Sequence, residues 1–491
     1  MSNRLCGNRD PHALSRRQML AQGVGFGSVA LAAMLAEQGA PKVGFADSTH
    51  PTGSNAAPGS SLKAQPLVPR PPHFEPKAKR VIFLFMHGGP STIDLLDYKP
   101  VLAANDNKPL PFAQPRVVSS ETGNLLASPW KFTPRGQCGT PVSELLPHHG
   151  SVIDDLCVMN SVHGSNSRHG AALLELHTGS DTFVRPSMGS WINYGLGTVN
   201  QNLPGFITIC PSSTHGGLNA WSSAFLPAHF QGTSIGREGA DATSAKVPFI
   251  TQSKIAPDLQ RMELDALRQI NADRLSVTGP DSALEARIES FELAFRMQSQ
   301  VPAVQDLSGE PEHIRKMYGL DKDSTKNFGT QCLLARRFAE AGVRFVQVTH
   351  SYWDSHGNLK AEHAKLAGQM DQPAAALIKD LKQRGMLDDT LVLWGGEFGR
   401  TPTAQGRDGR DHNPHGMTMW MAGGGVRGGM RYGSTDEFGY YAVDKKIHFH
   451  DLHATILHLL GLDHTALTYR HVGRDFRLTD LYGHVVKDII A

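Results

Sequence analysis

The stretch Arg80-Val81-Ile82-Phe83-Leu84-Phe85-Met86 is an unbroken apolar run after its first residue, and the turn residues His87-Gly88-Gly89-Pro90 follow it at once. A strand with one solvated face alternates polar and apolar residues, whereas a strand buried on both faces does not. A run of this length that ends in glycine and proline is typical of a central strand in a parallel sheet. We therefore predict a buried parallel strand over 80–86.

Helical and extended patterns alternate through the carboxyl-terminal half. The expected helices are 281–300, 328–341, 361–384 and 451–460, and the expected strands are 343–349, 390–394 and 417–421. Strands that alternate with helices of this length indicate βαβ units. The predicted fold class is α/β, with a mostly parallel central sheet and helices on both faces, in a single large domain over 80–491. A stretch at about 180–280 is rich in Gly, Pro and Ser with weak periodicity, and we expect a loop-rich insertion there.

The composition excludes several classes of protein. The chain has 491 residues, of which 40% are hydrophobic and 19% charged, so it can bury a sizeable core and is not a disordered polyelectrolyte. A net charge of +2 gives no reason to expect nucleic acid as a partner. Histidine is in excess, with 24 residues against 9 tyrosines and 6 tryptophans. Because imidazole is the commonest metal ligand and titrates near neutrality, this excess points to metal or acid–base chemistry.

Residues 1–46 resemble a twin-arginine export signal, because Ser15-Arg16-Arg17-Gln18-Met19-Leu20 precedes an uncharged Gly/Ala-rich run over 21–36. That run is too short and too small-residued for a membrane span, so none is expected after cleavage. Residues 47–79 lack an apolar period and predict a disordered spacer. The expected partner is the twin-arginine export machinery, and the expected location is periplasmic or otherwise extracytoplasmic.

Polar side chains follow three of the expected strands, at the points where the strands end. In doubly wound sheets, ligands gather outside the carboxyl ends of the strands, so these side chains should meet at one edge. Imidazole and carboxylate groups on three sequence-distant strand ends suit a shared metal site. The predicted metal ligands are His87, Asp94, Asp354, His356, Glu397, His412 and His415.

The mixed ligand set suits a divalent metal ion. Zinc, manganese, iron and calcium are the candidates, although calcium alone would prefer oxygen ligands throughout. The number of ions is left open. The alternative is that these residues only form local hydrogen bonds, and in particular that Glu397 forms an ion pair with Arg400 on the following turn.

Four runs resemble the signatures of the DUF1501 family of exported bacterial proteins. They are His87-Gly88-Gly89-Pro90-Ser91-x-x-Asp94, 353–358, 396–402 and 409–412. The resemblance covers about residues 78–485. This family is placed near the sulfatases in the alkaline phosphatase superfamily, so the resemblance implies an alkaline phosphatase/sulfatase-like fold.

The resemblance fails at the nucleophile. Sulfatases of this superfamily carry a Cys or Ser in C/S-x-P-x-R, and no such pentapeptide occurs here. The corresponding segment is 163–179, where the resemblance puts either His169 or Asn166 in the nucleophile position, with Ser165 and Ser167 nearby. Arginines would neutralise the non-bridging oxygens of an ester. The implied catalytic candidates are His163, Arg168, His169 and Arg400.

Two hypotheses of function stay open. The first is an exported, metal-dependent hydrolase of phosphate or sulfate esters that does not use formylglycine, with a small-molecule or glycan ester as substrate. The second is a non-catalytic sulfatase-like protein that keeps the fold and binds a glycan or a surface partner, because the nucleophile motif is missing. An exported redox protein is a third class, supported only by the export route.

Overall fold

This computed structural model describes residues 67–491 except 114–121, 249, 251–254 and 280. The predicted signal, 1–46, and the first part of the predicted spacer lie outside the described residues. The chain divides into a larger unit, Gln65–Thr251 with Glu285–Ala491, and a smaller unit, Met1–Ala64 with Gln252–Leu284. The smaller unit contains the helix α6 (Pro257–Thr278). The site and the cleft described below belong to the larger unit.

A large, mostly parallel sheet forms the centre of the larger unit. The order of its main path is β13 (Met430–Tyr432), β5 (Leu156–His163), β12 (Met417–Ala422), β9 (Thr390–Gly395), β1 (Arg80–Met86), β8 (Phe345–His350), β6 (Phe206–Ile209) and β7 (Thr233–Ile235), and β16 (Ile447–His448) pairs with β5. Strand β12 is antiparallel to both of its neighbours, and the other pairs are parallel. The predicted strand over 80–86 is confirmed as β1, in the middle of this sheet.

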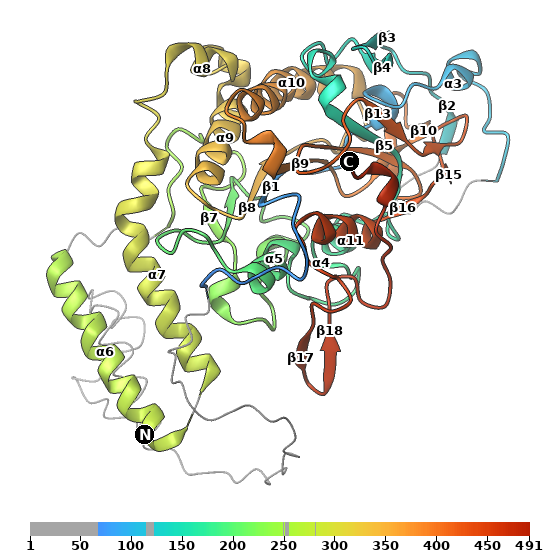
Figure 1. Cartoon of the computed structure of the whole chain (residues 1–491). Helices are drawn as coiled ribbons and strands as arrows, with labels where there is room; N and C mark the ends of the chain where they lie inside the picture. Colours follow the sequence, from blue (N-terminus) through green and yellow to red (C-terminus); the bar gives the residue numbers. More distant parts are fainter. Residues whose placement is uncertain (1–66, 114–121, 249, 251–254, 280) are drawn as a thin grey trace, which may run out of the picture. The chain divides into compact units, whose positions relative to one another are not determined.

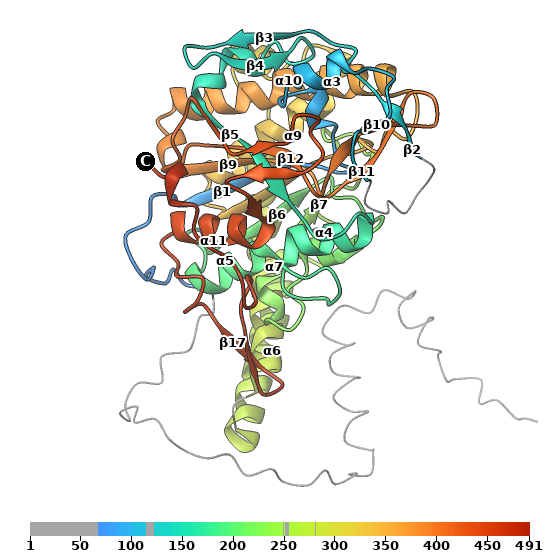
Figure 2. The ribbon, with the colours of Figure 1, turned by 90° about the vertical axis from the view of Figure 1, so that its right-hand side faces the viewer.

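Helices cover both faces of the sheet (Figures 1 and 2). On one face lie α9 (Asp323–Glu340) and α10 (Leu359–Gln383), and on the other lie α4 (His169–Thr178), α5 (Met188–Leu196) and α11 (Phe449–Leu459). The predicted α/β class, with helices on both faces of a mostly parallel sheet, is therefore confirmed. None of the helices in the described ranges has the length and apolar character needed to cross a bilayer.

Smaller elements complete the described chain. The remaining helices are α3 (Pro100–Ala104), α7 (Ser282–Gln305) and α8 (Glu312–Met317). A separate sheet has the order β11 (Gly409–Asn413), β10 (Gly399–Gln405) and β2 (Thr122–Leu125). Three strand pairs are β3 (Phe132–Arg135) with β4 (Thr140–Ser143), β14 (Ser434–Thr435) with β15 (Ala442–Asp444), and β17 (Tyr469–His471) with β18 (Arg474–Phe476).

Two of the sequence expectations need correction. Residues 67–79, expected to be part of a disordered spacer, pack on the domain: Leu67 and Ala78 are buried, and the Ala78 amide donates to the Leu459 carbonyl at 2.8 Å. The stretch 180–280, expected to be loops, contains α5 and α6 and two strands of the central sheet. Strands of three or four residues, such as β6 and β7, are too short to show a period.

The sheet topology brings four strand ends to one edge. Strands β1, β8 and β9 are mutually parallel, and β5 runs in the same direction because β12 is antiparallel to both β5 and β9. The carboxyl ends of parallel strands lie at the same edge of a sheet. The segments that follow these four strands therefore meet, although they are far apart in sequence.

Four buried histidines predict a steep loss of stability in acid. Burial lowers the pKa of His177 and His350 to about 4 and that of His363 and His453 to about 3. In the unfolded chain these rings take up protons near pH ~6.5. Because the folded pKa values are depressed, stability is complete above pH ~6.5 and falls as the pH drops towards 4, by up to ~1.4 kcal/mol per pH unit for each histidine.

This pH dependence can be measured by denaturant unfolding between pH 4 and 7. The substitution His453→Gln should lower the slope of the unfolding free energy against pH by the equivalent of about one proton, because it removes one titrating ring. The variant should fold, because the glutamine amide can still donate to the Leu176 carbonyl, which His453 Nε2 contacts at 2.7 Å. An unchanged slope in a folded His453→Gln variant would contradict the depressed pKa of His453.

Candidate metal centre

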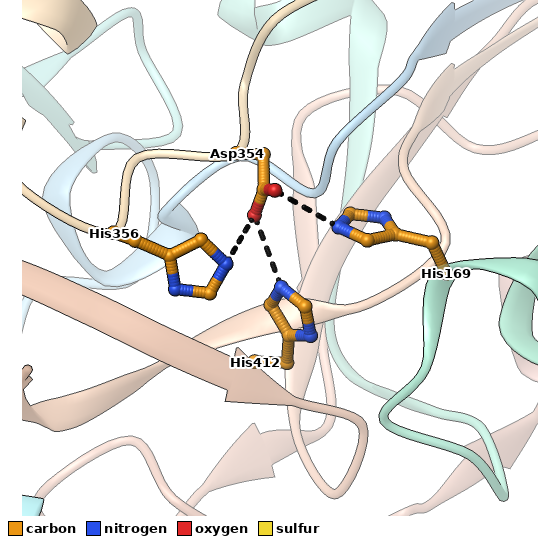
Figure 3. A group of neighbouring side chains, drawn as sticks. All are labelled: His169, Asp354, His356 and His412. Atoms are coloured by element: carbon orange, nitrogen blue, oxygen red, sulfur yellow. Dashed lines mark hydrogen bonds and ion pairs between the residues drawn. The ribbon is translucent and has the colours of Figure 1, made fainter. Parts of the chain in front are cut away.

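Three histidines surround one aspartate at the carboxyl edge of the sheet (Figure 3). His169, Asp354, His356 and His412 each offer a ligand atom, and these atoms lie within 4.8 Å of one another. Asp354 Oδ1 lies 2.9 Å from His356 Nε2 and 3.0 Å from His412 Nε2, and Asp354 Oδ2 lies 3.2 Å from His169 Nε2. We call these residues the four-residue site.

Three separate segments supply the site. Asp354 and His356 lie in the loop between β8 and α10, His169 is the first residue of α4 after β5, and His412 lies in β11. In Figure 3 the carboxylate of Asp354 stands in the centre and all three rings point towards it. The strand ends thus bring together Asp354, His356 and His412 from the predicted ligand set, and add His169, which was predicted as catalytic.

The tautomer of His412 follows from its second contact. His412 Nδ1 lies 2.7 Å from the backbone carbonyl of Ser167, which can only accept a hydrogen bond, so Nδ1 carries the proton. Burial lowers the pKa of His412, so the ring is neutral and its Nε2 presents a lone pair. That lone pair faces the Asp354 carboxylate, which is also an acceptor.

The other two rings are arranged in the same way. His169 Nδ1 lies 2.7 Å from Oε1 of the buried Glu397, and His356 Nδ1 contacts Oε1 of Gln405. In each ring the Nδ1 side is occupied by an acceptor, and Nε2 faces Asp354. Histidines that bind metals characteristically donate their other N–H to a carboxylate, a carbonyl or water, which fixes the ring orientation and the tautomer.

The electrostatics of the site favour positive charge beside Asp354. Burial disfavours the ionised form of Asp354, but the three imidazoles and the guanidinium of Arg400 outweigh burial and hold the pKa of Asp354 well below its usual range. Burial also lowers the pKa of His169, yet the carboxylates of Asp354 and Glu397 on either side raise it to about 9. The ionised carboxylate therefore needs cationic partners.

Arg400 holds the site together and does not face an open surface. Its side chain is fully buried, and its Nη2 donates to Asp354 Oδ1 at 2.7 Å. Its Nε donates to the Gly89 carbonyl at 2.8 Å, and Nη2 also contacts the Gly88 carbonyl. Arg400 was predicted to bind substrate; its donors instead fix the loop after β1 and the Asp354 carboxylate.

Glu397 has a different place from the one predicted. It is completely buried and accepts hydrogen bonds from the Gly88 amide at 3.0 and 3.2 Å, and from His169. The ion pair with Arg400 that was the alternative does not occur, because Arg400 pairs with Asp354. Glu397 contacts Nδ1 of His169, the nitrogen opposite the one that faces Asp354, so it is not a member of the four-residue site.

Two more of the predicted ligands lie outside this group. His87 follows β1, with Nδ1 3.6 Å from Oε1 of Glu238, and its ring centroid lies 6.3 Å from that of His169. Asp94 forms a buried ion pair with Arg410, whose Nε donates to Oδ2 at 2.8 Å. Asp94 is thus a structural partner of β11 and not a neighbour of Asp354.

The remaining candidates also lie away from the four-residue site. His163 ends β5 and its ring centroid lies 5.1 Å from that of His448. His415 packs against the rings of Tyr440 and Tyr441. Arg168 is the exposed residue immediately before α4. These positions follow from local turns, which strand-end reasoning does not specify.

The residues that orient the rings were not predicted from sequence. Gln405 ends β10, and the Ser167 carbonyl belongs to the loop before α4. Neither residue belongs to a recognisable motif. Because every residue has a backbone carbonyl, the sequence cannot show which carbonyl orients a ring. Only the pairing of β10 with β11, which sets Arg400 opposite His412, brings this part of the site into register.

The fold and the site define a mixed α/β protein with a histidine–aspartate cluster at the carboxyl edge of its parallel strands. The chain belongs to the DUF1501 family, whose model, "Protein of unknown function (DUF1501)", matches residues 78–490. The family resemblance carried by the four sequence runs is thereby confirmed.

Several solved structures are similar to this chain. The PsFucS1 sulfatase from Pseudoalteromonas sp. is 12% identical, over 78% of this chain and 68% of that chain, with a TM-score of 0.33. A protein in the alkaline phosphatase superfamily from Vibrio parahaemolyticus is 10% identical, over 82% and 71%, with a TM-score of 0.33. The phosphonate monoester hydrolase SpPMH from Silicibacter pomeroyi is 14% identical, over 67% and 71%, with a TM-score of 0.30. The comparison with curated proteins finds no match. Structural similarity at these identities and TM-scores does not indicate an activity for this chain.

Proposed function

We propose that this protein is a metal-dependent hydrolase of phosphate or sulfate esters, with the metal bound by His169, His356, His412 and Asp354. One observation carries the proposal: each of the three rings has its Nδ1 held by an acceptor and its Nε2 aimed at the same carboxylate. This is the arrangement that orients imidazole ligands around a metal ion.

The geometry calls for a cation between the rings and Asp354. His412 is the clearest case, because its neutral ring has only a lone pair at Nε2, and a lone pair 3.0 Å from Asp354 Oδ1 is repelled unless a cation lies between them. Despite burial, the Asp354 carboxylate raises the pKa of His169 and of His356, so these two rings can hold a proton at Nε2, but each proton serves one ring only. A single metal ion satisfies all three at once.

Three imidazoles and one carboxylate favour zinc, manganese or iron over calcium, which prefers oxygen ligands. Zinc ligands lie about 2.0–2.2 Å from the metal, so two ligands of a tetrahedral site are about 3.3–3.6 Å apart. The ligand atoms here lie within 4.8 Å of one another. Small rotations of these side chains would therefore bring all four donor atoms within binding distance of one ion, and an ion that accepts a fifth ligand would keep a position for an ester oxygen.

The site is open to solvent on one side. The side chains of Asp354 and His356 are 36% and 34% exposed, whereas those of His169 and His412 are 9% and 10% exposed. An ester can therefore approach from the side of the β8–α10 loop. A bound metal would supply Lewis acidity to an ester oxygen, and the chain's own residues hold the ligands and the carboxylate in place.

The function is tested with protein that has been stripped by a chelator and reloaded with zinc, manganese or iron. The loaded protein should melt at a higher temperature than the stripped protein, and should hydrolyse aryl phosphates, phosphodiesters or aryl sulfates. Full metal occupancy without turnover on any of these esters would refute the hydrolase and leave the metal site standing. Unchanged melting on chelation, with no metal found by elemental analysis, would refute both.

A separate prediction concerns Glu397. The variant Glu397→Gln should bind metal about tenfold more weakly, at the lower end of the ~10–100-fold loss typical of partners of metal-bound histidines, because the amide oxygen still accepts from His169 but lacks the charge. Isothermal titration of the stripped protein measures this loss. The matched control is Glu144→Gln, in which the altered carboxylate accepts, among the described residues, from the Lys131 amide alone; it should bind metal as the wild type does. Equal affinities in the two variants would contradict the role of Glu397.

A non-catalytic, metal-bearing protein that binds a glycan or a surface partner is the second candidate. One observation favours it: Ser165, one of the two serines near the predicted nucleophile position, has its hydroxyl engaged elsewhere, because Ser165 Oγ donates to Glu175 at 2.7 Å. This candidate would be supported if the protein binds metal and binds a glycan tightly but hydrolyses none of the esters.

We also propose twin-arginine export to an extracytoplasmic compartment. Arg16 and Arg17 before the uncharged 21–36 run support it. Replacement of both arginines by lysine should retain the full-length chain in the cytoplasm, as measured by fractionation of the expressing cells. Normal delivery of that variant would contradict this route.

A further inference from the structure

A cleft lies where the carboxyl end of α4 meets the start of α11. Its volume is about 1180 Å³, and it is bounded by 179–185, 448–451 and 477–487. Figures 1 and 2 show α4 and α11 on the same face of the sheet. Ligand sites for small molecules usually measure about 300–1,000 Å³, so this cleft has room for a ligand larger than a simple monoester.

The carboxylates of the cleft are already satisfied by the protein. Glu175 accepts from the Ser165 amide at 2.8 Å and contacts His448 Nε2 at 3.2 Å. Asp451 accepts from the backbone amides of His448 and His484 at 2.9 and 2.7 Å. Asp181, a third carboxylate of the lining, accepts from Thr182 Oγ1 at 2.9 Å and from Asn166 Nδ2 at 3.4 Å. Each of these acidic groups is engaged by hydrogen bonds with the protein.

Asp480 is satisfied in the same way, because it pairs with Arg185 at 2.9 Å and with Arg474. Two cationic side chains of the cleft wall form no ion pair with the described carboxylates. Within the described part of the chain, the guanidinium of Arg477 donates only through its Nε, to the Asp480 carbonyl, and the ammonium group of the exposed Lys487 forms no hydrogen bond or ion pair. The cleft therefore offers a guanidinium fork and an ammonium group to an anionic ligand.

Exposed aromatic rings border the same cleft. Tyr482 is 63% exposed and stacks on the ring of His450 at 5.1 Å, and Phe183 is 64% exposed. Exposed aromatic side chains next to polar groups are characteristic of binding sites, because they offer large, rigid contact surfaces. Rings that flank cations suit a ligand with apolar ring faces and anionic substituents.

The cleft is close to the four-residue site along the chain. Ser165 lines the cleft, and Ser167, two residues later, supplies the carbonyl that orients His412. Two residues span at most about 7 Å. A chain-like ligand seated in the cleft can therefore extend towards the metal ligands.

We propose that this cleft binds a polyanionic glycan, a sulfated or phosphorylated polysaccharide segment, and so defines the substrate class of the hydrolase. The proposal rests on the proposed function only for the link to catalysis, because binding is measurable alone. The sugar rings would stack on Tyr482 and Phe183, and the ester groups would pair with Arg477 and Lys487.

The probe is dextran sulfate, compared with unsulfated dextran of equal length, at an ionic strength of about 0.15 M to screen exposed charges. Dextran sulfate should bind and dextran should bind much more weakly. The double variant Arg477→Gln/Lys487→Gln should lower the affinity for dextran sulfate about tenfold or more. Tyr482→Ala should weaken binding severalfold while all charges are kept.

The matched control is Lys360→Gln/Lys365→Gln, which removes two exposed charges from α10 on the opposite face of the sheet. It should leave the affinity unchanged. Equal losses in the control and the cleft variant, equal binding of dextran, or tighter binding of a single-stranded oligonucleotide of matched charge would each overturn the proposal.

Failure of this proposal can be told apart from failure of the proposed function. The variant Arg477→Gln/Lys487→Gln should keep full metal content. His412→Ala should lose metal and keep its affinity for dextran sulfate. A His412→Ala variant that is folded but no longer binds dextran sulfate would show that the glycan does not bind in this cleft.

Discussion

Asp354→Asn should abolish the binding of divalent metal ions, with a loss of at least about a hundredfold in affinity, beyond the ~10–100-fold expected for an outer partner such as Glu397. Asp354 is the one residue that all three histidines face, and asparagine removes its charge while keeping its size. The amide oxygen of asparagine can still accept from Arg400, so the fold should survive. Elemental analysis and isothermal titration of the stripped variant measure the effect.

The control for this result is Asp408→Asn, which changes an exposed aspartate whose carboxylate accepts from the Asn358 amide. It should bind metal as the wild type does. Far-UV circular dichroism of Asp354→Asn distinguishes loss of the site from loss of the fold. A folded Asp354→Asn variant with wild-type metal content would refute the metal centre.

Asp94→Asn should lower the free energy of unfolding by about 3–5 kcal/mol, because it leaves the Arg410 charge buried without its partner. Both side chains of this pair are completely buried. Two contacts join them: Arg410 Nε to Oδ2 at 2.8 Å and Arg410 Nη2 to Oδ1 at 3.1 Å. Denaturant unfolding measures the loss, and metal content at low temperature should stay unchanged.

The double variant Asp94→Asn/Arg410→Met separates the cost of an unpaired charge from the cost of lost packing. Replacing both ions of a buried pair is far less harmful than removing one. Part of the stability should therefore return, although Arg410 also donates to the carbonyls of Thr401 and Leu126. If the double variant is no more stable than Asp94→Asn, the buried charge is not the cause.

The sequence predicted the parts of the site that follow directly from the sheet. An apolar run such as 80–86 can only be a buried strand, so its carboxyl end, and the ends of the neighbouring strands, could be placed at one edge. Asp354, His356 and His412 could therefore be predicted as neighbours from the sequence alone. The tautomers of the rings could not be found in this way, because they depend on Gln405 and on a backbone carbonyl.

Glu397 shows the limit of strand-end reasoning. Its place after β9 predicted that it would be paired or metal-bound, and it is paired, but with His169 and the Gly88 amide. One or two backbone angles decide on which face of a turn a carboxylate lies. These angles cannot be predicted from the periodicity of the sequence. The same holds for Asp94, whose partner Arg410 lies 316 residues away.

The wide spacing of the ligands in the chain has a consequence for the timing of metal uptake. The ring of His412 and the carbonyl that orients it are 245 residues apart, so the site comes into being only when the sheet has closed. A nascent chain offers no preformed site, and metal binding then accompanies folding. Under the proposed export route the chain folds before it crosses the membrane, so the metal ions free in the cytoplasm, and not those outside, would decide which ion is loaded.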